Sequence, residues 1–462
     1  QAVQDARVLD LLRTQVPREG SSRQVAWDAK FNGFAGSLGG GDIGWAFGAE
    51  ARREQVEDRP SPLATANPQT GAVPVIGFGS TSADARRTQW ALYAESFLPI
   101  SEQFDVRIAG RYDHYSDFGG DFNPAAAFRW RPADWFVLRG GWNSSFRAPS
   151  LAQAGAGVTL SSGVLPCAPG SEFINTFCGG TARDRNYLSE VYSNPDLKAE
   201  TAEAWYLGSV FSLGDRSTLR LDYWKFDQRN LVDIDALDLF RRAVADPSLV
   251  RDSRDPRPPF GTLGILTRGG RVGDRIDEVF LQLDNVGRQR TEGLDIGFDH
   301  DFVEAGWGRL RFYTDVTWVR SFERSESCSA TGGDARRGAG PCVGGQRLVE
   351  RVGEFRYPEW TVNSGFRFSR GDWMARLWAN HVDGYYDDDQ RDGVPAGRRI
   401  PSWTTLNLNL DYDLSERQTL GLTIRNLTDR DPPVALGSAS NVDLYNHNTL
   451  GRFWTFSWIY RY

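Results

Sequence analysis

The chain has 462 residues, of which 40% are hydrophobic, 13% aromatic and 24% charged. It contains no apolar run near the ~18 residues that a membrane-spanning helix needs, and its 16 Trp, 15 Tyr and 27 Phe residues are too many for a disordered chain. The net charge of −7 disfavours nucleic acid as a partner, because proteins that bind nucleic acid usually carry a basic surplus.

Apolar and polar residues alternate with period two along most of the chain. In one stretch Leu406, Leu408 and Leu410 alternate with Asn407 and Asn409. Because successive side chains of a strand point to opposite faces, this pattern predicts strands with one apolar and one polar face. We expect fifteen of them, near 23–36, 42–54, 86–98, 103–115, 121–131, 135–146, 198–212, 217–230, 278–300, 308–321, 358–369, 372–384, 402–413, 418–428 and 452–462.

The connections between these strands are alternately short and long. The long ones lie near 55–85, 147–197, 231–277, 322–357, 385–401 and 429–451, and a shorter one on the same side lies near 116–120. Tight turns on one side and long loops on the other are typical of an outer-membrane β-barrel. The alternative, a soluble β-sandwich, is much shorter and does not place its long loops on one side only. The sequence therefore predicts an all-β protein, a transmembrane antiparallel up-and-down barrel.

The number of strands adds an expectation about the rest of the barrel. In a meander of fifteen strands the first and the last run in the same direction, whereas bacterial barrels have an even number of antiparallel strands. We therefore expect at least one further strand before residue 1. The chain begins at Gln1 and its only methionine is Met374, as expected for a processed protein or a fragment.

The four cysteines form two close pairs in stretches rich in Gly, Ser and Pro. The spacing predicts two local loop disulfides, Cys167–Cys178 and Cys328–Cys342, although free thiols are the alternative. The chain has no CxxC motif and only four histidines, so no metal site is expected.

Polar and aromatic residues gather in the segment 381–392. We expect this segment to lie in an outer loop, where a ligand could contact Tyr385, Tyr386, Asp387, Asp388 and Asp389. A solvated acidic loop is the simpler interpretation, and calcium a third, although the spacing of an EF-hand loop is missing. No G-x-S-x-G motif is present, so we expect neither an enzyme nor a cofactor. Helical spacing in 231–245, and less clearly in 8–13, predicts loop helices.

Four segments resemble motifs of the TonB-dependent outer-membrane receptors. They are SFRAPSL at 145–151, NPDLKAETA at 194–202, NVGRQRTEGLDIGF at 285–298 and IRNLTDRDP at 424–432. The second has Ala199 where the family usually has Pro, the third has Asp295 for Glu, and the fourth departs at Thr428 and Pro432. The segments are spread through most of the chain, so the resemblance covers it broadly.

This resemblance implies a barrel of about 22 strands with a plugged lumen. Residues 1–462 would be its C-terminal portion, without the plug domain and about seven early strands. Such a receptor lies in the outer membrane of a Gram-negative bacterium, binds a scarce small-molecule nutrient and imports it when TonB acts on the plug. Siderophores, cobalamin, saccharides and other metal chelates remain open as substrates. A passive porin and a surface adhesion barrel are the alternatives.

The last strand carries aromatic residues at every second position. They are Trp454, Phe456, Trp458, Tyr460 and the final residue, Tyr462. On a strand all five lie on one face, which we expect to face lipid. This ending resembles the signal by which the barrel-assembly machinery recognises its clients; an ordinary aromatic girdle is the alternative.

Overall fold

The computed structural model describes residues 14–65, 82–155, 157–165, 167, 171, 173–181, 183–259, 261–302, 306–327, 346–388, 394–438 and 440–461. Their main element is one antiparallel sheet in which fifteen strands follow each other in chain order, with β16 (Gln346–Glu350) paired to the end of β15. The fifteen strands are β1 (Arg18–Leu38), β2 (Gly41–Pro60), β3 (Ala83–Ser101), β4 (Phe104–Tyr115), β5 (Gly119–Ala133), β6 (Phe136–Arg147), β9 (Glu200–Leu213), β10 (Ser217–Asp233), β14 (Asp284–Asp301), β15 (Arg309–Ser327), β17 (Trp360–Arg370), β18 (Trp373–Val382), β21 (Trp403–Ser415), β22 (Gln418–Arg425) and β23 (Phe453–Tyr460).

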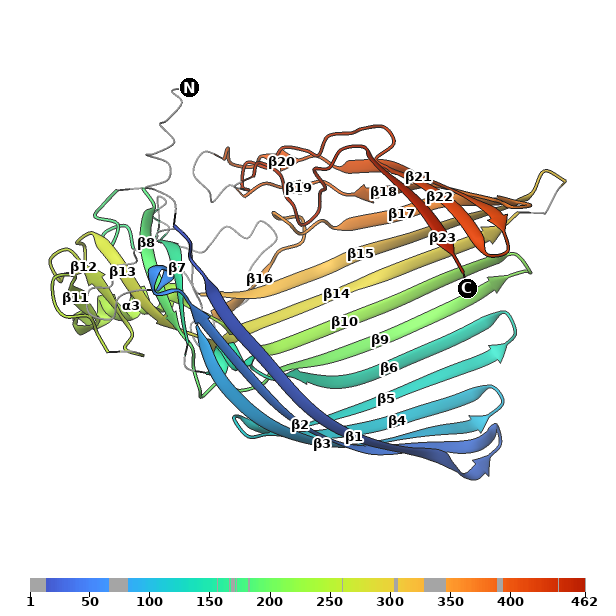
Figure 1. Cartoon of the computed structure of the whole chain (residues 1–462), viewed down its shortest axis with the longest axis horizontal. Coiled ribbons are helices and arrows are strands. Elements are labelled where there is room, and N and C mark those ends of the chain that lie inside the picture. Colours follow the sequence, from blue (N-terminus) through green and yellow to red (C-terminus); the bar gives the residue numbers. More distant parts are fainter. Residues whose placement is uncertain are drawn as a thin grey trace.

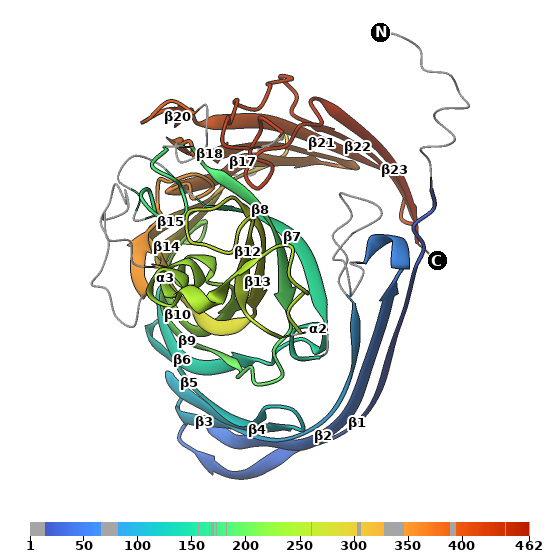
Figure 2. The same ribbon diagram turned by 90° about the vertical axis from the view of Figure 1, so that its left-hand side faces the viewer.

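The predicted meander is confirmed, and its connections alternate in length except for the tight turn between β4 and β5. Figure 1 shows tight turns at one end of the strands and long connections at the other, which we call the turn end and the loop end. Seen from the loop end, the sheet curls round so that β1 and β23 come to the same side of the molecule (Figure 2). Fourteen antiparallel steps separate these two strands, so they run in the same direction.

The outer face of the sheet is apolar. Cross-strand partners share a face, and Leu408 stands opposite Leu377 on one side and Ile424 on the other. Aromatic residues continue this face along the sheet, as in the pairs Phe31–Phe47 and Trp318–Trp360. Leaving such a surface exposed to water would be costly, so it suits hydrocarbon.

The inner face is polar and is crossed by ion pairs between neighbouring strands. Asp299 accepts hydrogen bonds from Arg220 (2.6 Å) and Arg311 (2.8 Å), which flank it on β10 and β15. Asp222 on β10 also accepts from Arg139 on β6 at 3.0 Å, across the intervening strand β9. Pairing of this kind keeps each charge compensated where the curved wall limits its contact with water.

A second, smaller sheet is built from the long connections. It contains β7 (Val158–Leu165), β8 (Arg185–Tyr192), β11 (Val250–Asp252), β12 (Gly264–Thr267) and β13 (Ile276–Gln282), in the order β11-β12-β13-β8-β7. In both figures it lies at the loop end, over the space that the large sheet surrounds. It has a core of its own, in which Phe177, Phe240 and Val279 are fully buried.

Short elements complete the loop end. They are η1 (Pro62–Ala64), α2 (Leu151–Ala154), α3 (Ala236–Ala245), η2 (Pro247–Leu249), β19 (Tyr385–Tyr386) and β20 (Arg399–Ile400). The helix predicted in 231–245 is confirmed as α3, although residues 231–233 belong to β10. The helix predicted in 8–13 lies outside the described residues. None of the helices described is long and apolar enough to cross a bilayer.

One strand prediction was wrong. The segment 278–300 is not a single strand but β13 followed by β14, which belong to different sheets. Three consecutive residues of β13, Val279, Phe280 and Leu281, are buried. A strand in the middle of a covered sheet buries both faces, so its apolar residues run consecutively, whereas β14 alternates. This change of pattern marks the boundary near Leu283, whose N–H donates to the Tyr192 carbonyl.

The facing of β21 gives a testable prediction. Leu408→Arg should lower the free energy of unfolding in a bilayer by about 2–4 kcal/mol if it lies near the membrane midplane, because the guanidinium would face lipid. Asn409→Arg should change it by no more than about 0.5 kcal/mol, because this inner position is hydrated and lies beside Asp411. Urea unfolding in lipid vesicles measures both; equal losses would contradict the facing.

Candidate functional site

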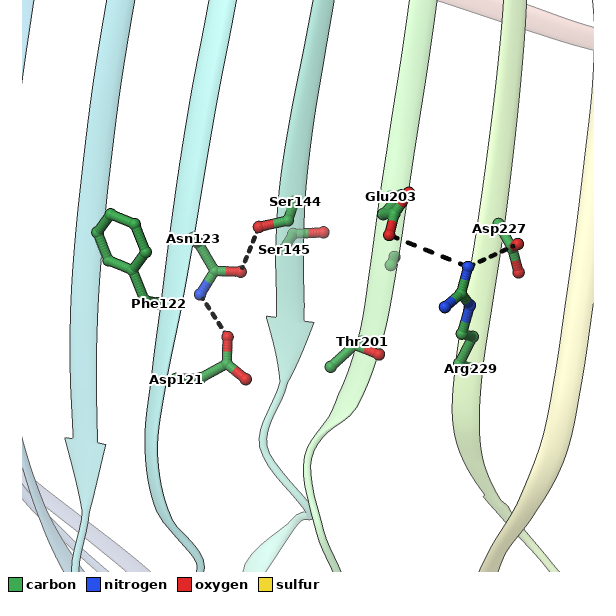
Figure 3. Close-up of a pocket in the computed structure, with 10 residues that line it drawn as sticks. Asp121, Phe122, Asn123, Ser144, Ser145, Thr201, Glu203, Asp227 and Arg229 are labelled. Atoms are coloured by element: carbon green, nitrogen blue, oxygen red, sulfur yellow. Dashed lines mark hydrogen bonds and ion pairs between the residues drawn. The ribbon is translucent and has the colours of Figure 1, made fainter.

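The loop end of the wall contains a polar hollow of about 220 Å³ between β5, β6, β9 and β10 (Figure 3). It forms because β5 and β6 pair only from Ala125 and Asn143 toward the turn end. Nearer to the loops the two strands separate. The hollow is lined by Asp121, Phe122, Asn123, Ser144, Ser145, Thr201, Ala202, Glu203, Asp227 and Arg229.

Hydrogen bonds and ion pairs hold the polar groups of this hollow. On one side the Asn123 amide donates to Asp121 (2.9 Å) and its oxygen accepts from the Ser144 hydroxyl (3.4 Å). On the other side Arg229 lies 3.3 Å from an Asp227 oxygen and 4.0 Å from Glu203. Hydroxyl, amide, carboxylate and guanidinium groups thus surround one small space. They are suited to hydrogen-bonding a polar ligand, and the Arg229 guanidinium to an anionic group on it.

Three of the four motif segments meet beside this hollow. Residues 145–147 of the first pair with 200–202 of the second, and Arg147 binds Glu200 at 2.6 Å. Asn285, which opens the third, donates to the Lys198 carbonyl (3.0 Å) and accepts from the Lys198 N–H (2.8 Å). These contacts tie the loop ends of β6, β9 and β14 together, so the motifs act as joints where strands enter loops.

The fourth motif closes a turn. Asn426 has φ of 52°, and its side chain accepts from the Arg430 N–H and donates to the Arg430 carbonyl. Asparagine tolerates this left-handed backbone better than most residues.

Two residues of the segment 381–392, where ligand contacts are predicted, are enclosed by other loops. Tyr385 is fully buried and donates its hydroxyl to Asp443 at 2.5 Å. Asp387 is 1% exposed and accepts from Arg398 and from the N–H groups of residues 436 and 437. These two residues join the loop after β18 to the loop after β22. Because both are buried, the interpretation of this segment as a solvated acidic loop does not apply to them.

The remaining residues of that loop are less enclosed. Tyr386 is half-buried beneath the Arg399 guanidinium, which lies 4.8 Å from its ring centre. Asp388 is also half-buried, and Asp389 lies outside the described residues. Contact with a ligand therefore remains a prediction, and of the two tyrosines only Tyr386 has an accessible side chain.

His447 is the least satisfied polar group of this region. Its ring stacks on Tyr385 and meets Trp403 edge-on, and its side chain is 5% exposed. Neither ring nitrogen has a hydrogen-bond partner among the described residues. Burial lowers the pKa of the His447 imidazole, while nearby Asp443 opposes this shift. The neutral ring is thus the form that this loop cluster accommodates.

One of the two predicted disulfides lies within the described residues. Cys167 and Cys178 form a disulfide with Cα atoms 5.8 Å apart, buried in the core of the smaller sheet. Cys328 and Cys342 lie outside the described residues.

The aromatic ending of the chain lies on β23, where Trp454, Phe456, Trp458 and Tyr460 are exposed on one face. Tyr462 lies outside the described residues. Recognition by the assembly machinery remains a prediction. Among the described residues, no group of three or more His, Cys, Asp or Glu could hold a metal ion.

Comparison with known proteins gives a consistent result. A family model described as TonB dependent receptor-like, beta-barrel, matches residues 5–427. The chain is similar to the iron-regulated outer membrane virulence protein of Vibrio cholerae serotype O1, with 28% identity over 169 residues that cover 37% of this chain and 20% of the relative. It is also similar to the heme/hemopexin utilization protein C of Haemophilus influenzae, with 22% identity over 34% of this chain and 21% of the relative.

Solved structures share the fold. A crystal structure of the ferric enterobactin receptor of Pseudomonas aeruginosa with enterobactin superposes with a TM-score of 0.62 at 17% identity, over 96% of this chain and 54% of that chain. The siderophore receptor PirA of Acinetobacter baumannii gives 0.61 at 17% identity, over 96% and 55%. The chain therefore spans about half the length of these structures.

The disulfide gives a prediction about the smaller sheet. Cys167→Ser/Cys178→Ser should destabilise this sheet by about 2–4 kcal/mol, because the unfolded loop regains the freedom that the crosslink removes. Limited proteolysis within 158–192 should become faster, while the large sheet stays resistant. Unchanged cleavage, or a mass spectrum showing four free thiols in the native protein, would contradict it.

His447 gives a prediction about pH. Because its folded pKa is lowered, the folded loops bind fewer protons than the unfolded loops below the ordinary histidine pKa of about 6.5. Loop stability should be constant above that pH and should fall as the pH decreases through the window between 6.5 and the folded pKa.

Hydrogen exchange of residues 383–388 and 440–450 at pH 7.5 and 5.0 measures this effect. After correction for the intrinsic pH dependence of amide exchange, lower protection at pH 5.0 that His447→Phe abolishes is the expected result. The same loss of protection in the wild type and in His447→Phe would assign it to another group.

Proposed function

The chain belongs to the TonB-dependent receptor-like β-barrel family of the bacterial outer membrane, and from this premise we propose that it forms wall and loops of a receptor for an iron-carrying small molecule. The ligand would be a ferric siderophore or haem. TonB would energise its import. The relatives support this choice, because their names refer to iron regulation, to heme and hemopexin, and to siderophores.

The observation that carries the proposal is the combination of a polar inner wall with an ordered loop sheet at its mouth. The ion pairs of Asp222 and Asp299 line a surface along which a polar ligand could pass. The smaller sheet, with its own buried core and disulfide, covers part of the loop end. A receptor must capture its ligand there before transport, whereas a passive porin needs a freely open mouth.

The hollow beside the motif joints is the proposed contact site for the ligand. It lies at the loop end, and it offers Ser145, Thr201 and Glu203 for hydrogen bonds and Arg229 for an anionic group. Siderophores present oxygen donors and often carry negative charge, so this set of groups complements them. Tyr386, half-buried at the loop end, is a second proposed contact.

We also propose that the fifteen strands belong to a larger barrel with a plug. Strands β1 and β23 run in the same direction, so direct pairing between them would be parallel. Further strands would restore the even, antiparallel arrangement of bacterial barrels. The solved relatives, which are almost twice as long, are consistent with this. TonB would then act through the plug.

Growth under iron limitation tests the function. A strain lacking the gene should fail to grow on one ferric siderophore or on haem as the only iron source, and the complete gene should restore growth. A strain lacking TonB should show the same failure, because transport is energised. Arg229→Ala in the complete protein should weaken binding of that ligand at least several-fold, while Arg370→Ala at the turn end serves as the control.

Each alternative has its own outcome. Uptake that persists without TonB would indicate a passive channel. Unchanged growth on every iron source tested, together with reduced surface attachment, would indicate an adhesion barrel.

A further inference from the structure

Arginines on the outer and inner faces of β1, β2 and β3 differ in their partners. The inner ones are paired with carboxylates: Arg52 lies 2.5 Å from Glu50, and Arg87 lies 3.0 Å from Glu54. Of the outer ones, Arg59 is paired with Glu57, whereas Arg23, Arg53 and Arg86 have no ion-pair partner among the described residues. All three are exposed.

These three outer arginines lie together. Arg23 and Arg86 both stand opposite Gln55, from the strands on either side of β2. They are therefore two strand spacings apart, or about 10 Å. Arg53 is two residues from Gln55 on the same face of β2. It therefore lies on the strand between Arg23 and Arg86, one row nearer to the turn end. Long guanidinium side chains from these positions can reach one anionic group.

Their position along the strands is equally specific. The next outer row toward the turn end contains Trp27, Ala51 and Trp90, which stand in register. Trp27 is 60% exposed and Trp90 is 44% exposed. Tryptophan collects where a barrel meets the lipid headgroups, so the arginines lie just outside the hydrocarbon, on the loop side.

Neighbouring carboxylates do not neutralise this group. The outer row on the loop side contains Glu57 and Asp84, which stand opposite each other. Glu57 is paired with Arg59. Positive charge in direct proximity to positive charge is unfavourable on a sheet, so an external anion would stabilise the arrangement.

We propose that Arg23, Arg53 and Arg86 bind the phosphate groups of lipid headgroups in the outer leaflet of the membrane. Arginine donates up to five hydrogen bonds in a fixed fork and matches phosphate geometry. Trp27 and Trp90, on the turn-end side of the arginines, would contact the acyl chains of the same lipid. This site lies on the lipid side of the wall, separate from the hollow, and does not depend on the transported substrate.

Lipid binding to the purified complete protein in detergent tests the site. The probe is lipid A carrying two phosphates, compared with its dephosphorylated form and with phosphatidylcholine, by native mass spectrometry. An arginine near a membrane surface contributes about 1 kcal/mol, so each single Arg→Gln change should weaken binding of bis-phosphorylated lipid A about fivefold and the triple change by more than about 50-fold. Binding should also weaken as salt rises.

Matched variants separate the site from general charge and from folding. Arg370→Gln removes another outward-facing arginine at the turn end and should leave binding unchanged. The triple Arg→Lys variant keeps the charge and should lose less affinity than the triple Gln variant. Heat-modifiable migration of every variant checks folding; if the triple variant does not fold, the single Arg53→Gln variant decides.

Two results would overturn the proposal. One is equal affinity of the wild type for phosphorylated and dephosphorylated lipid A. The other is a folded Gln variant, triple or single, that binds bis-phosphorylated lipid A as tightly as the wild type.

Discussion

The need to pair every backbone N–H and C=O group inside hydrocarbon determines the architecture of this protein. Lipid offers no hydrogen-bond partner, so a strand can cross it only between two other strands. Fourteen antiparallel pairings provide these partners across the large sheet. The alternation of the sequence follows from the same constraint, because each strand presents an apolar face to lipid and a polar face to the lumen. Within the part of the chain that the structure describes, β1 and β23 end the sheet, so each leaves one edge without a pairing strand.

Charge is arranged according to the same two faces. On the inner wall arginines are joined to aspartates across strands, as Arg220 and Arg311 are joined to Asp299. On the outer wall Lys225 and Glu292 lie in the middle of their strands beside Trp205, and they are paired with each other at 3.6 Å. The loop end is organised differently, as a separate unit with its own sheet, core and disulfide. A rigid unit of this kind can hold ligand-binding groups in place while the wall remains a uniform barrier.

The sequence predicted the wall far better than the loops, for a physical reason. Period-two alternation is imposed by lipid and water and is visible in each strand separately, so all but one of the fifteen ranges agree with the structure. Burial in the loops depends on packing between distant segments. The enclosure of Tyr385 requires Asp443 and His447, and the hollow depends on where the pairing of β5 ends, at Ala125. In the sequence, only the motifs at 145–151 and 194–202, which contain Ser145 and Thr201, pointed to the location of the hollow.

The central claim is that alternate residues of one strand face lipid and water, and spin labels placed singly at residues 404–411 test it most directly. In the complete protein reconstituted in vesicles, labels at Leu406, Leu408 and Leu410 should collide mainly with oxygen dissolved in lipid. Labels at Thr405, Asn407 and Asn409 should be shielded from oxygen and, where the lumen is open, reached by a water-soluble nickel chelate. Strict alternation of oxygen accessibility with period two is the result that a membrane wall predicts. Uniform accessibility along the strand, or nickel access on the leucine face, would contradict it.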